Sequence, residues 1–275
     1  MQPFDLFRSA LDTDAPILID SPHSGRWYPV DFNVQIKHET LRMAEDLFVD
    51  QLYQCAPNYG ASLLVANFPR SYIDVNRAID DIDPLLFGPP DTVSQSNTTV
   101  KSSLGMGIVW RLLANEPIYG RFLTPAEVQN RIATYYVPYH EVLTTEADRL
   151  YQKHGRLLHL NVHSMPDASR HYLGLPPAPL ADIVLGDLEG TTCSAKTVRR
   201  VSDVFRSHGF SVALNDPFKG ADLIRKTCDV AKGKEALQIE FKRSIYSDVA
   251  THRMHVGGLK AQLAIEDLLR DLTAS

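Results

Sequence analysis

The most constraining feature of this 275-residue chain is a series of short apolar runs separated by helical patterns. The runs are nearly continuous in hydrophobicity rather than alternating, which is typical of strands covered by helices on both faces of a sheet. They lie at residues 15–20, 61–66, 156–162, 182–185, 211–214 and 236–241. This alternation of strand and helix predicts an α/β fold with a largely parallel or mixed sheet.

The helical patterns lie between these runs. Residues 40–53 place an apolar stripe on one face, with Thr40 as a possible N-cap. A longer helix begins at Thr124, where a capping-box spacing and a proline coincide, and its pattern continues towards residue 151. We expect Pro138 to kink it. Two further helices are predicted at residues 197–207 and 257–272.

The stretch from residue 80 to residue 107 is rich in proline, serine, threonine and glycine. It predicts a long irregular segment, and such segments inside compact domains often have a function. The sequence contains no internal repeat, no low-complexity tract and no composition shift that marks a linker. A single domain over residues 1–275 is therefore the simplest interpretation.

Composition excludes several classes of protein. A hydrophobic content of 44% is enough for a substantial core. A net charge of −5 lacks the positive excess that is typical of nucleic-acid-binding proteins. The three cysteines are widely spaced, which favours a reducing cytoplasm over a disulfide scaffold. The first ten residues contain no apolar signal, and we find no apolar stretch long enough to span a bilayer. We expect a cytoplasmic protein; the sequence leaves the oligomeric state open.

Two histidines directly follow predicted strands. His23 lies on the turn after residues 15–20, and His163 comes after residues 156–162. Ligands bind at the carboxyl ends of strands in open α/β sheets, and imidazole is the commonest zinc ligand in proteins. The two side chains can therefore converge on one metal ion. His159, four residues earlier, is either a residue that supports His163 or a packed core histidine.

A catalytic zinc site usually has a third protein ligand. Asp46 and Glu45 lie in the helix predicted at residues 40–53, and Asp46 is the preferred candidate. The alternative is that both acidic residues belong to a solvated helix face.

Two further groups of residues are candidates for substrate binding and for proton transfer. Arg70, Asn76 and Arg77 follow the strand at 61–66 and can bind a substrate carboxylate, since guanidinium pairs with it bidentately. The alternative is surface pairing with nearby aspartates. Glu240 is an acidic residue inside an apolar strand, where burial raises a carboxyl pKa towards the range of a general base. The alternative role of Glu240 is a buried salt bridge to Lys242 or Arg243.

Taken together, these segments resemble the N-formylglutamate amidohydrolase (N-formylglutamate deformylase) family. The resemblance extends over nearly the whole chain, in the same order. The matching segments are SPHSG at 21–25, ED at 45–46, SYIDVNR at 71–77, YVPYH at 136–140, HSMP at 163–166, DIVLGDLEGTTC at 182–193, NDPFKG at 215–220 and LQIEFKRSIY at 237–246.

The resemblance implies a three-layer fold similar to the zinc carboxypeptidases and aspartoacylases, with a mixed central sheet flanked by helices. It implies zinc-dependent hydrolysis of N-formyl-L-glutamate to formate and L-glutamate, a terminal step of one route of histidine degradation. The implied zinc ligands are His23, His163 and Asp46 or Glu45. Glu240 resembles the general base, with Arg26 or Lys219 stabilising the oxyanion. We assign substrate binding to Arg70, Asn76, Arg77, Lys219 and Arg243.

Two positions depart from the expected pattern. Carboxypeptidase-like enzymes usually place an acidic ligand three residues after the first histidine, but Arg26 is at that position here. The family commonly has a double glycine after the lysine of the NDPFKG segment, where this chain has Gly220 and Ala221. The added methyl group can change the shape of the pocket and therefore the substrate that it accepts.

Three other hypotheses compete with this one. A cysteine hydrolase would use Cys193 as nucleophile and His163 as base, but it leaves His23 and Glu240 without a role. A non-catalytic sensor would keep only the carboxylate-binding residues. A related metal-dependent amidohydrolase would act on another N-acyl acidic amino acid, for example N-formylaspartate.

Overall fold

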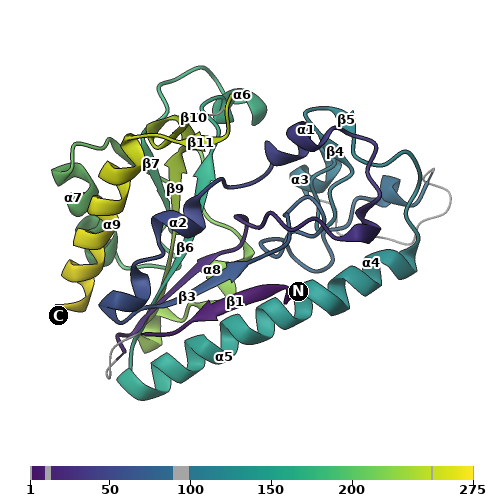
Figure 1. Ribbon diagram of the computed structural model, residues 1–275. Helices are drawn as coiled ribbons and strands as arrows, with labels where there is room; N and C mark the ends of the chain where they lie inside the picture. Colours follow the sequence, from purple (N-terminus) through teal and green to yellow (C-terminus); the bar gives the residue numbers. More distant parts are fainter. Residues whose placement is uncertain (1, 10–13, 89–98, 249, 275) are drawn as a thin grey trace. The chain divides into compact units, whose positions relative to one another are not determined.

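A computed structural model describes residues 2–9, 14–88, 99–248 and 250–274 (Figure 1). These residues group into two compact units. The first comprises residues 1–5, 22–45 and 65–143, and the second comprises residues 6–21, 46–64 and 144–275. We describe each unit by itself; the prediction of a single domain stays a prediction.

The main structural feature is a seven-stranded sheet with the strand order β1-β3-β2-β6-β9-β7-β8. The parallel pairs include β2 with β6, β6 with β9 and β7 with β8, whereas β7 runs antiparallel to β9. The predicted mixed sheet is thus confirmed. The strands are β1 (Phe4–Phe7), β2 (Ile17–Ser21), β3 (Ser62–Ala66), β6 (Leu157–Met165), β7 (Ile183–Gly186), β8 (Val212–Leu214) and β9 (Lys234–Lys242).

All six predicted strands are present, within a few residues of the predicted bounds. β1 was not predicted, because its four residues alternate between partly buried and exposed positions and form no apolar run. The central strands β2 and β6 are almost entirely buried, which explains their near-continuous apolar sequences.

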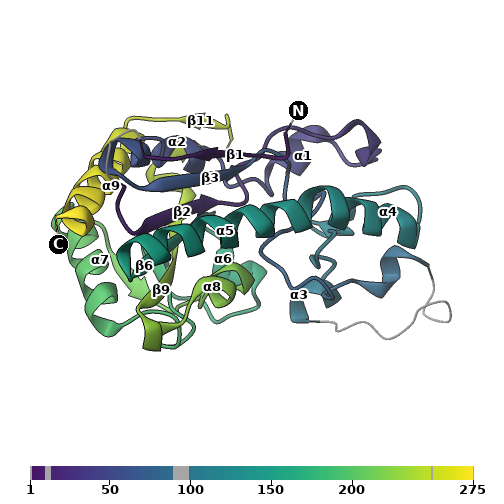
Figure 2. The same ribbon diagram turned by 90° about the horizontal axis from the view of Figure 1, so that it is seen from below.

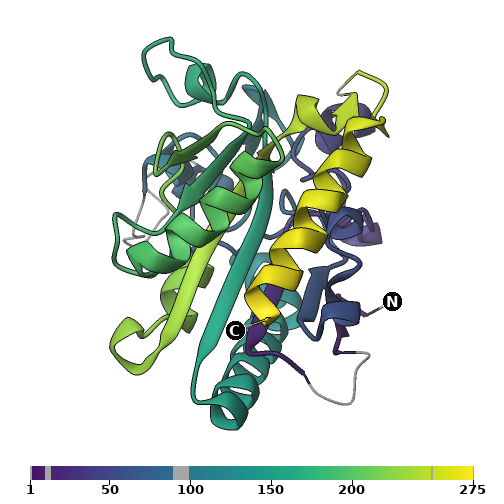
Figure 3. The same ribbon diagram turned by 90° about the vertical axis from the view of Figure 1, so that its left-hand side faces the viewer.

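Helices of the second unit cover both faces of its strands. On one face, Phe241 of β9 packs edge-on against Phe205 of α7 (Ala195–Ser207) and Tyr53 at the end of α2 (Val49–Leu52). Figure 3 shows α7 beside α9 (Gly257–Thr273) in front of the strands. On the other face, His159 of β6 contacts Thr227 of α8 (Asp222–Thr227), which lies next to β9 in Figure 2.

The prediction of one helix over residues 40–53 is wrong. The structure has α1 (His38–Arg42) and α2 (Val49–Leu52), and residues 43–48 between them are not helical. Phe48 has a left-handed backbone, with φ of 64°, which ends any helical continuation. The break lets two adjacent acidic side chains, Glu45 and Asp46, reach different partners, Tyr28 and His163.

The helix predicted from Thr124 onwards is confirmed, including its capping box with Glu127. It comprises α4 (Pro125–Arg131), a π-helical turn at Ile132–Tyr136 and α5 (Val137–His154). The wider turn lies directly before Pro138. Because proline has no N–H group to donate to the preceding turn, a local π-helical irregularity accommodates it.

The first unit contains little regular structure besides α1, α4 and part of α5. Its core is built from aromatic rings around Arg131, which is 1% exposed. The guanidinium group lies 4.0 Å from the ring centroid of Tyr72 and donates hydrogen bonds to Tyr72 O and Tyr119 Oη. Short elements complete this unit: α3 (Val100–Ser103), β4 (Leu112–Leu113) and β5 (Glu116–Pro117).

The irregular segment predicted at residues 80–107 contains only α3 and a 3-10 turn at Pro84–Leu86 among its described residues. Residues 89–98 of this prediction lie outside the described residues. In the second unit, the remaining short elements are α6 (Ser169–Tyr172), β10 (Ser247–Asp248) and β11 (Arg253–Met254). Within the described parts of the chain, no helix combines the length and apolar character needed to cross a membrane.

Candidate functional site

The turn that carries His23 is held against the segment that follows β3. Gly25 lies so close to Phe68 that a Cβ atom would be 2.1 Å from the Phe68 carbonyl oxygen, so only glycine fits at this position. A hydrogen bond of 2.9 Å from Trp27 N to Asn67 O also holds the turn against this segment. This close packing explains the glycine of the SPHSG segment and fixes the position of His23.

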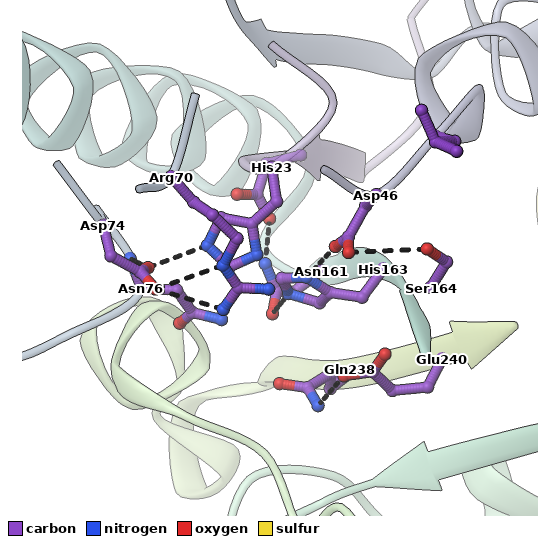
Figure 4. A network of polar contacts seen from close by, with 12 residues as sticks. His23, Asp46, Arg70, Asp74, Asn76, Asn161, His163, Ser164, Gln238 and Glu240 are labelled. Atoms are coloured by element: carbon purple, nitrogen blue, oxygen red, sulfur yellow. Dashed lines mark hydrogen bonds and ion pairs between the residues drawn. The ribbon is translucent and has the colours of Figure 1, made fainter. Parts of the chain in front are cut away.

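Asp74 is the centre of the first polar cluster, which we define as His23, Arg70, Asp74, Asn76 and Arg77. Its Oδ1 lies 2.8 Å from His23 Nε2 and accepts a hydrogen bond from Asn76 N (Figure 4). Its Oδ2 accepts from Arg70 Nη2 at 3.0 Å. Arg77 Nε lies 3.9 Å from the same oxygen. The three residues predicted to bind a carboxylate thus gather around an aspartate of the chain itself.

The carboxyl group of Asp74 is fully buried. Burial by itself raises its pKa. The charges of His23, Arg70 and Arg77 outweigh burial and hold the pKa well below its ordinary value. Asp74 is therefore ionised near neutral pH and accepts the proton on His23 Nε2. When the His23 ring is neutral, its Nδ1 then has the lone pair that a metal ion needs.

The second polar cluster lies at the carboxyl end of β6, and we define it as Asp20, Asp46, Asn161, His163, Ser164 and Arg243. His163 Nε2 is 2.7 Å from Asn161 Oδ1, and His163 Nδ1 is 2.9 Å from Asp46 Oδ2. Ser164 Oγ lies 3.4 Å from Asp46 Oδ1. His163 is 2% exposed and Asp46 is fully buried, so both are shielded from water.

Glu45 and Asp46, the two candidates for the third metal ligand, have different surroundings. Glu45 accepts a hydrogen bond of 2.5 Å from Tyr28 Oη and pairs with Arg42, whereas Asp46 faces His163. Both carboxyl groups are buried, so the alternative of a solvated helix face is wrong for these two residues. The contacts favour Asp46 over Glu45.

Asp46 and His163 of the second unit each offer one ligand atom, and His23 of the first unit offers another. Two imidazole nitrogens and one carboxylate oxygen are a donor set that zinc binds, with a fourth position left for water or substrate. If Nε2 of His163 donates to Asn161, then its Nδ1 and Asp46 Oδ2 are both acceptors 2.9 Å apart. Such a pair requires a proton or a metal cation between the atoms, so these residues fit a metal ion.

Glu240 is the register partner of His163, because β6 and β9 run parallel with His163 opposite Glu240 and Asn161 opposite Gln238. Cross-strand partners project from the same face of a sheet. Glu240 is 7% exposed and accepts a hydrogen bond of 3.0 Å from Gln238 Nε2. Lys242, one of the two cations considered as its salt-bridge partner, pairs instead with Asp182 at 2.8 Å.

The remaining predicted cations lie in different surroundings. Arg243 is 4% exposed, and its guanidinium group contacts Ser164 Oγ at 3.1 Å and Asp46 Oδ1 at 3.4 Å. Lys219 is exposed and pairs with Glu189 at 2.5 Å. Arg26 is exposed on the turn after His23. Of the three, Arg243 is therefore the buried one, and it contacts a predicted metal ligand.

Sequence comparison assigns the chain to a family. Residues 15–247 match the N-formylglutamate amidohydrolase family. The chain belongs to this family. It is 29% identical to an N-formylglutamate deformylase of Pseudomonas putida over 94% of this chain and 92% of that protein. A second N-formylglutamate deformylase, from Pseudomonas aeruginosa, is 27% identical over 85% of this chain and 82% of its own length.

One solved structure agrees with this assignment, and a second shares the fold. A crystal structure of N-formylglutamate amidohydrolase from Ralstonia eutropha JMP134 superposes with a TM-score of 0.95 at 41% identity, covering 100% of this chain and 98% of that one. The gene product Atu2144 from Agrobacterium tumefaciens shares the fold, with a TM-score of 0.65 at 17% identity over 99% of this chain and 94% of that chain.

Sequence reasoning gave no functional role to three residues that contact the predicted ligands or their partners. Asp74 was considered only as a surface partner of arginine, although it lies inside the SYIDVNR segment of the family pattern. Asn161 shares the strand face of His163, which its spacing of two residues indicates. Asp20 is the penultimate residue of β2, and only the pairing of β2 with β6 places it beside Asn161.

Proposed function

We propose that this protein is a zinc-dependent amidohydrolase that hydrolyses N-formyl-L-glutamate to formate and L-glutamate, as a step of histidine degradation. The observation that carries the proposal is the buried pair of Asp46 and His163 in a chain of the N-formylglutamate amidohydrolase family. Support for the substrate comes from relatives named N-formylglutamate deformylases, which match most of this chain.

We assign the metal ligands to His23, Asp46 and His163. When bound, the metal supplies Lewis acidity, which activates water near neutral pH and polarises a carbonyl group. Asp74 and Asn161 hold the Nε2 atoms of the two histidines, which orients both rings.

Glu240 acts as the general base and acid. It accepts a proton from the attacking water while a carbon–oxygen bond forms at the formyl carbon. It then returns the proton to the amide nitrogen as the carbon–nitrogen bond breaks, which releases formate and the amine of glutamate. The hydrogen bond from Gln238 to Glu240 Oε1 orients the carboxyl group for these transfers.

The cationic residues bind the substrate and the charge that develops on it. Arg26 stabilises the oxyanion, because a positive charge near the developing negative charge lowers the barrier. The carboxylates of glutamate are bound by guanidinium, ammonium and amide donors, which fix the orientation of the formyl group. The residues assigned to this role are Arg70, Asn76, Arg77, Lys219 and Arg243.

The test combines metal analysis of the purified protein with formate release from a panel of N-formyl amino acids. We expect about one zinc ion per chain and a preference for N-formyl-L-glutamate over N-formyl-L-leucine, with N-formyl-L-aspartate as the closest competitor. His163→Ala removes one proposed ligand, and His171→Ala alters an exposed histidine on α6 as a matched control. Full activity of His163→Ala, or of metal-free protein, contradicts the proposal.

A further inference from the structure

We propose that Tyr136 and His140 are positioning residues that hold the loop at residues 75–77. This loop carries Asn76 and Arg77, which are proposed to bind a substrate carboxylate, so the inference rests on the proposed function. It assigns a role to the YVPYH segment, which takes no part in the proposed chemistry. The loop and both side chains belong to the first unit.

The two side chains donate hydrogen bonds to the carbonyl groups on either side of Asn76. Tyr136 Oη lies 2.9 Å from Arg77 O, and His140 Nε2 lies 2.8 Å from Val75 O. A carbonyl oxygen only accepts, so His140 Nε2 carries a proton in this contact. Tyr136, His140 and Val75 are buried, so water does not readily replace a lost donor there.

The peptide unit between Val75 and Asn76 is held at both of its ends. His140 binds its carbonyl oxygen, and Asp74 Oδ1 accepts a hydrogen bond of 2.9 Å from its N–H group (Figure 4). A trans peptide unit is planar, with its C=O and N–H groups pointing in opposite directions. The unit therefore cannot rotate without breaking at least one of these hydrogen bonds, and the placement of the Asn76 side chain depends on His140.

Arg77 is fixed by contacts of its backbone and its side chain. Residues 71–77 form neither helix nor strand, so no regular hydrogen-bond ladder holds them. Arg77 N donates to Asp74 O at 3.3 Å, and Arg77 Nε donates to Met106 O at 3.2 Å. Tyr136 adds the hydrogen bond to the carbonyl group of Arg77.

Tyr136 and His140 also orient each other. Tyr136 ends the π-helical turn, and His140 lies four residues later in the first turn of α5. Their rings stack, with centroids 4.0 Å apart and an angle of 29° between the planes. Side chains at this spacing are neighbours on one helix face, and stacking restricts the rotation of both rings. Each ring therefore helps to aim the donor of the other.

The π-helical turn explains how the pair stays on the buried face of the helix. Buried positions recur here with a spacing of four, at 132, 136 and 140 and at 131, 135, 139 and 143. An α-helix rotates by about 100° per residue, so a spacing of four drifts by about 40° at each step. A π-helical turn contains more residues than an α-helical turn, which offsets the drift. The turn at Ile132–Tyr136 thus keeps both rows on one face.

Loss of either donor leaves a buried carbonyl group unsatisfied and gives the loop other conformations. Fewer molecules then have Asn76 and Arg77 in the arrangement that binds the carboxylate. Apparent affinity falls in proportion to that fraction. The loop takes no part in the proposed proton transfers, so KM should rise while kcat changes little.

The test compares four variants by steady-state formate release from N-formyl-L-glutamate. Tyr136→Phe removes one donor and keeps the ring, whereas His140→Leu removes the other donor together with its ring. His140→Gln keeps an N–H donor of similar reach. Tyr151→Phe, which also loses a hydroxyl group on α5 and whose ring contacts Lys234, is the matched control. Circular dichroism checks folding.

We expect Tyr136→Phe and His140→Leu to raise KM by about 5- to 50-fold, the usual effect of an unsatisfied buried polar group, with kcat within about twofold of the wild type. His140→Gln should recover most of the affinity, and Tyr151→Phe should keep KM within about twofold. An unchanged KM in either folded donor variant overturns the proposal, as does a fall in kcat at constant KM. Equal effects in Tyr136→Phe and Tyr151→Phe also overturn it. A His140→Gln variant no better than His140→Leu overturns the role of the His140 hydrogen bond.

Amide hydrogen exchange provides a readout that needs no activity, and it keeps the proposal testable if His140→Leu does not fold. The N–H group of Asn76 should exchange about fivefold faster or more in Tyr136→Phe than in the wild type, and at the wild-type rate in Tyr151→Phe. Equal protection in Tyr136→Phe and the wild type overturns the proposal. Faster exchange in Tyr136→Phe, combined with a wild-type protein that does not hydrolyse N-formyl-L-glutamate, contradicts the proposed function and leaves the role of Tyr136 in holding the loop intact.

Discussion

His163 of β6 and Glu240 of β9 are direct partners in the parallel register of two central strands. One is a proposed metal ligand and the other the proposed base, so the sheet itself fixes their spacing. Sites built on strands are more precisely positioned than sites built on loops, because the backbone hydrogen bonds of the sheet leave little freedom.

We predict that Glu240→Gln lowers kcat by about 100- to 10,000-fold, the usual contribution of a general base. Glutamine has nearly the same size and can still accept the hydrogen bond from Gln238, so the fold should be unchanged. Formate release gives kcat, and metal analysis should find the zinc content of the wild-type protein. Wild-type turnover in this variant would show that another group accepts the proton.

Metal removal should abolish activity, and added zinc should restore it. Because histidine binds metal only when it is deprotonated, protons compete with zinc, and zinc affinity should fall as the pH is lowered. Titration calorimetry in buffers of different ionisation enthalpy measures the protons released on binding. Activity that survives exhaustive chelation would exclude the metal-dependent mechanism.

Cys193 should be dispensable. It is 2% exposed, and burial, together with the negative charge of Glu235, raises the pKa of its thiol far above neutral pH. The reactive thiolate is therefore scarce, which disfavours the cysteine-hydrolase alternative. We expect iodoacetamide at pH 8 to leave activity intact, and Cys193→Ala to keep kcat/KM within about twofold. Stoichiometric inactivation by alkylation at Cys193 would reverse this conclusion.

The carboxyl group of Asp74 should make the fold sensitive to strong acid. Its folded-state pKa is well below the unfolded value of about 3.9, so the unfolded state takes up the proton first. Its contribution to stability is then complete above about pH 5 and is lost as the pH falls through the folded-state pKa. Urea unfolding of the zinc-free protein at several pH values should show a shallower decline for Asp74→Asn than for the wild type below pH 5.

Arg131→Lys should destabilise the first unit by about 1–3 kcal/mol. Lysine cannot stack its charge on Tyr72 as a flat guanidinium does, and it cannot reproduce both hydrogen bonds in a buried site. The matched control is Arg121→Lys, which alters a largely exposed ion pair with Glu127 and should change the free energy of unfolding by less than about 1 kcal/mol. Equal effects would mean that the aromatic surroundings do not matter.

Much of the sheet was predictable because a buried strand leaves a continuous apolar run, as in β2 and β6. The prediction of one helix at residues 40–53 was wrong, because hydrophobic periodicity does not report backbone conformation. Periodicity records which residues are buried, and Leu41, Ala44 and Leu52 are buried in the structure as predicted. It does not record the left-handed backbone at Phe48 that separates α1 from α2.

The candidate site, like the fold, was predictable from the sequence only in part. The ends of strands indicated His23 and His163, and an acidic residue inside an apolar strand indicated Glu240. The position of Arg70 and Arg77 after the strand at 61–66 indicated a group that binds carboxylate. The hydrogen bonds of Asp20 and Asp74 could not be predicted, because they depend on strand register and on loop packing around Gly25. Those contacts connect residues that are far apart in the sequence.

The pairing of Asp20 with Asn161 also has an evolutionary consequence. Each side chain satisfies the other inside the sheet, so replacing one alone leaves a buried polar group without its partner. Across homologous sequences, the two positions should therefore be exchanged together or kept together. An alignment of the family can test this, and positions such as Ser244 on the exposed surface should vary without any such coupling.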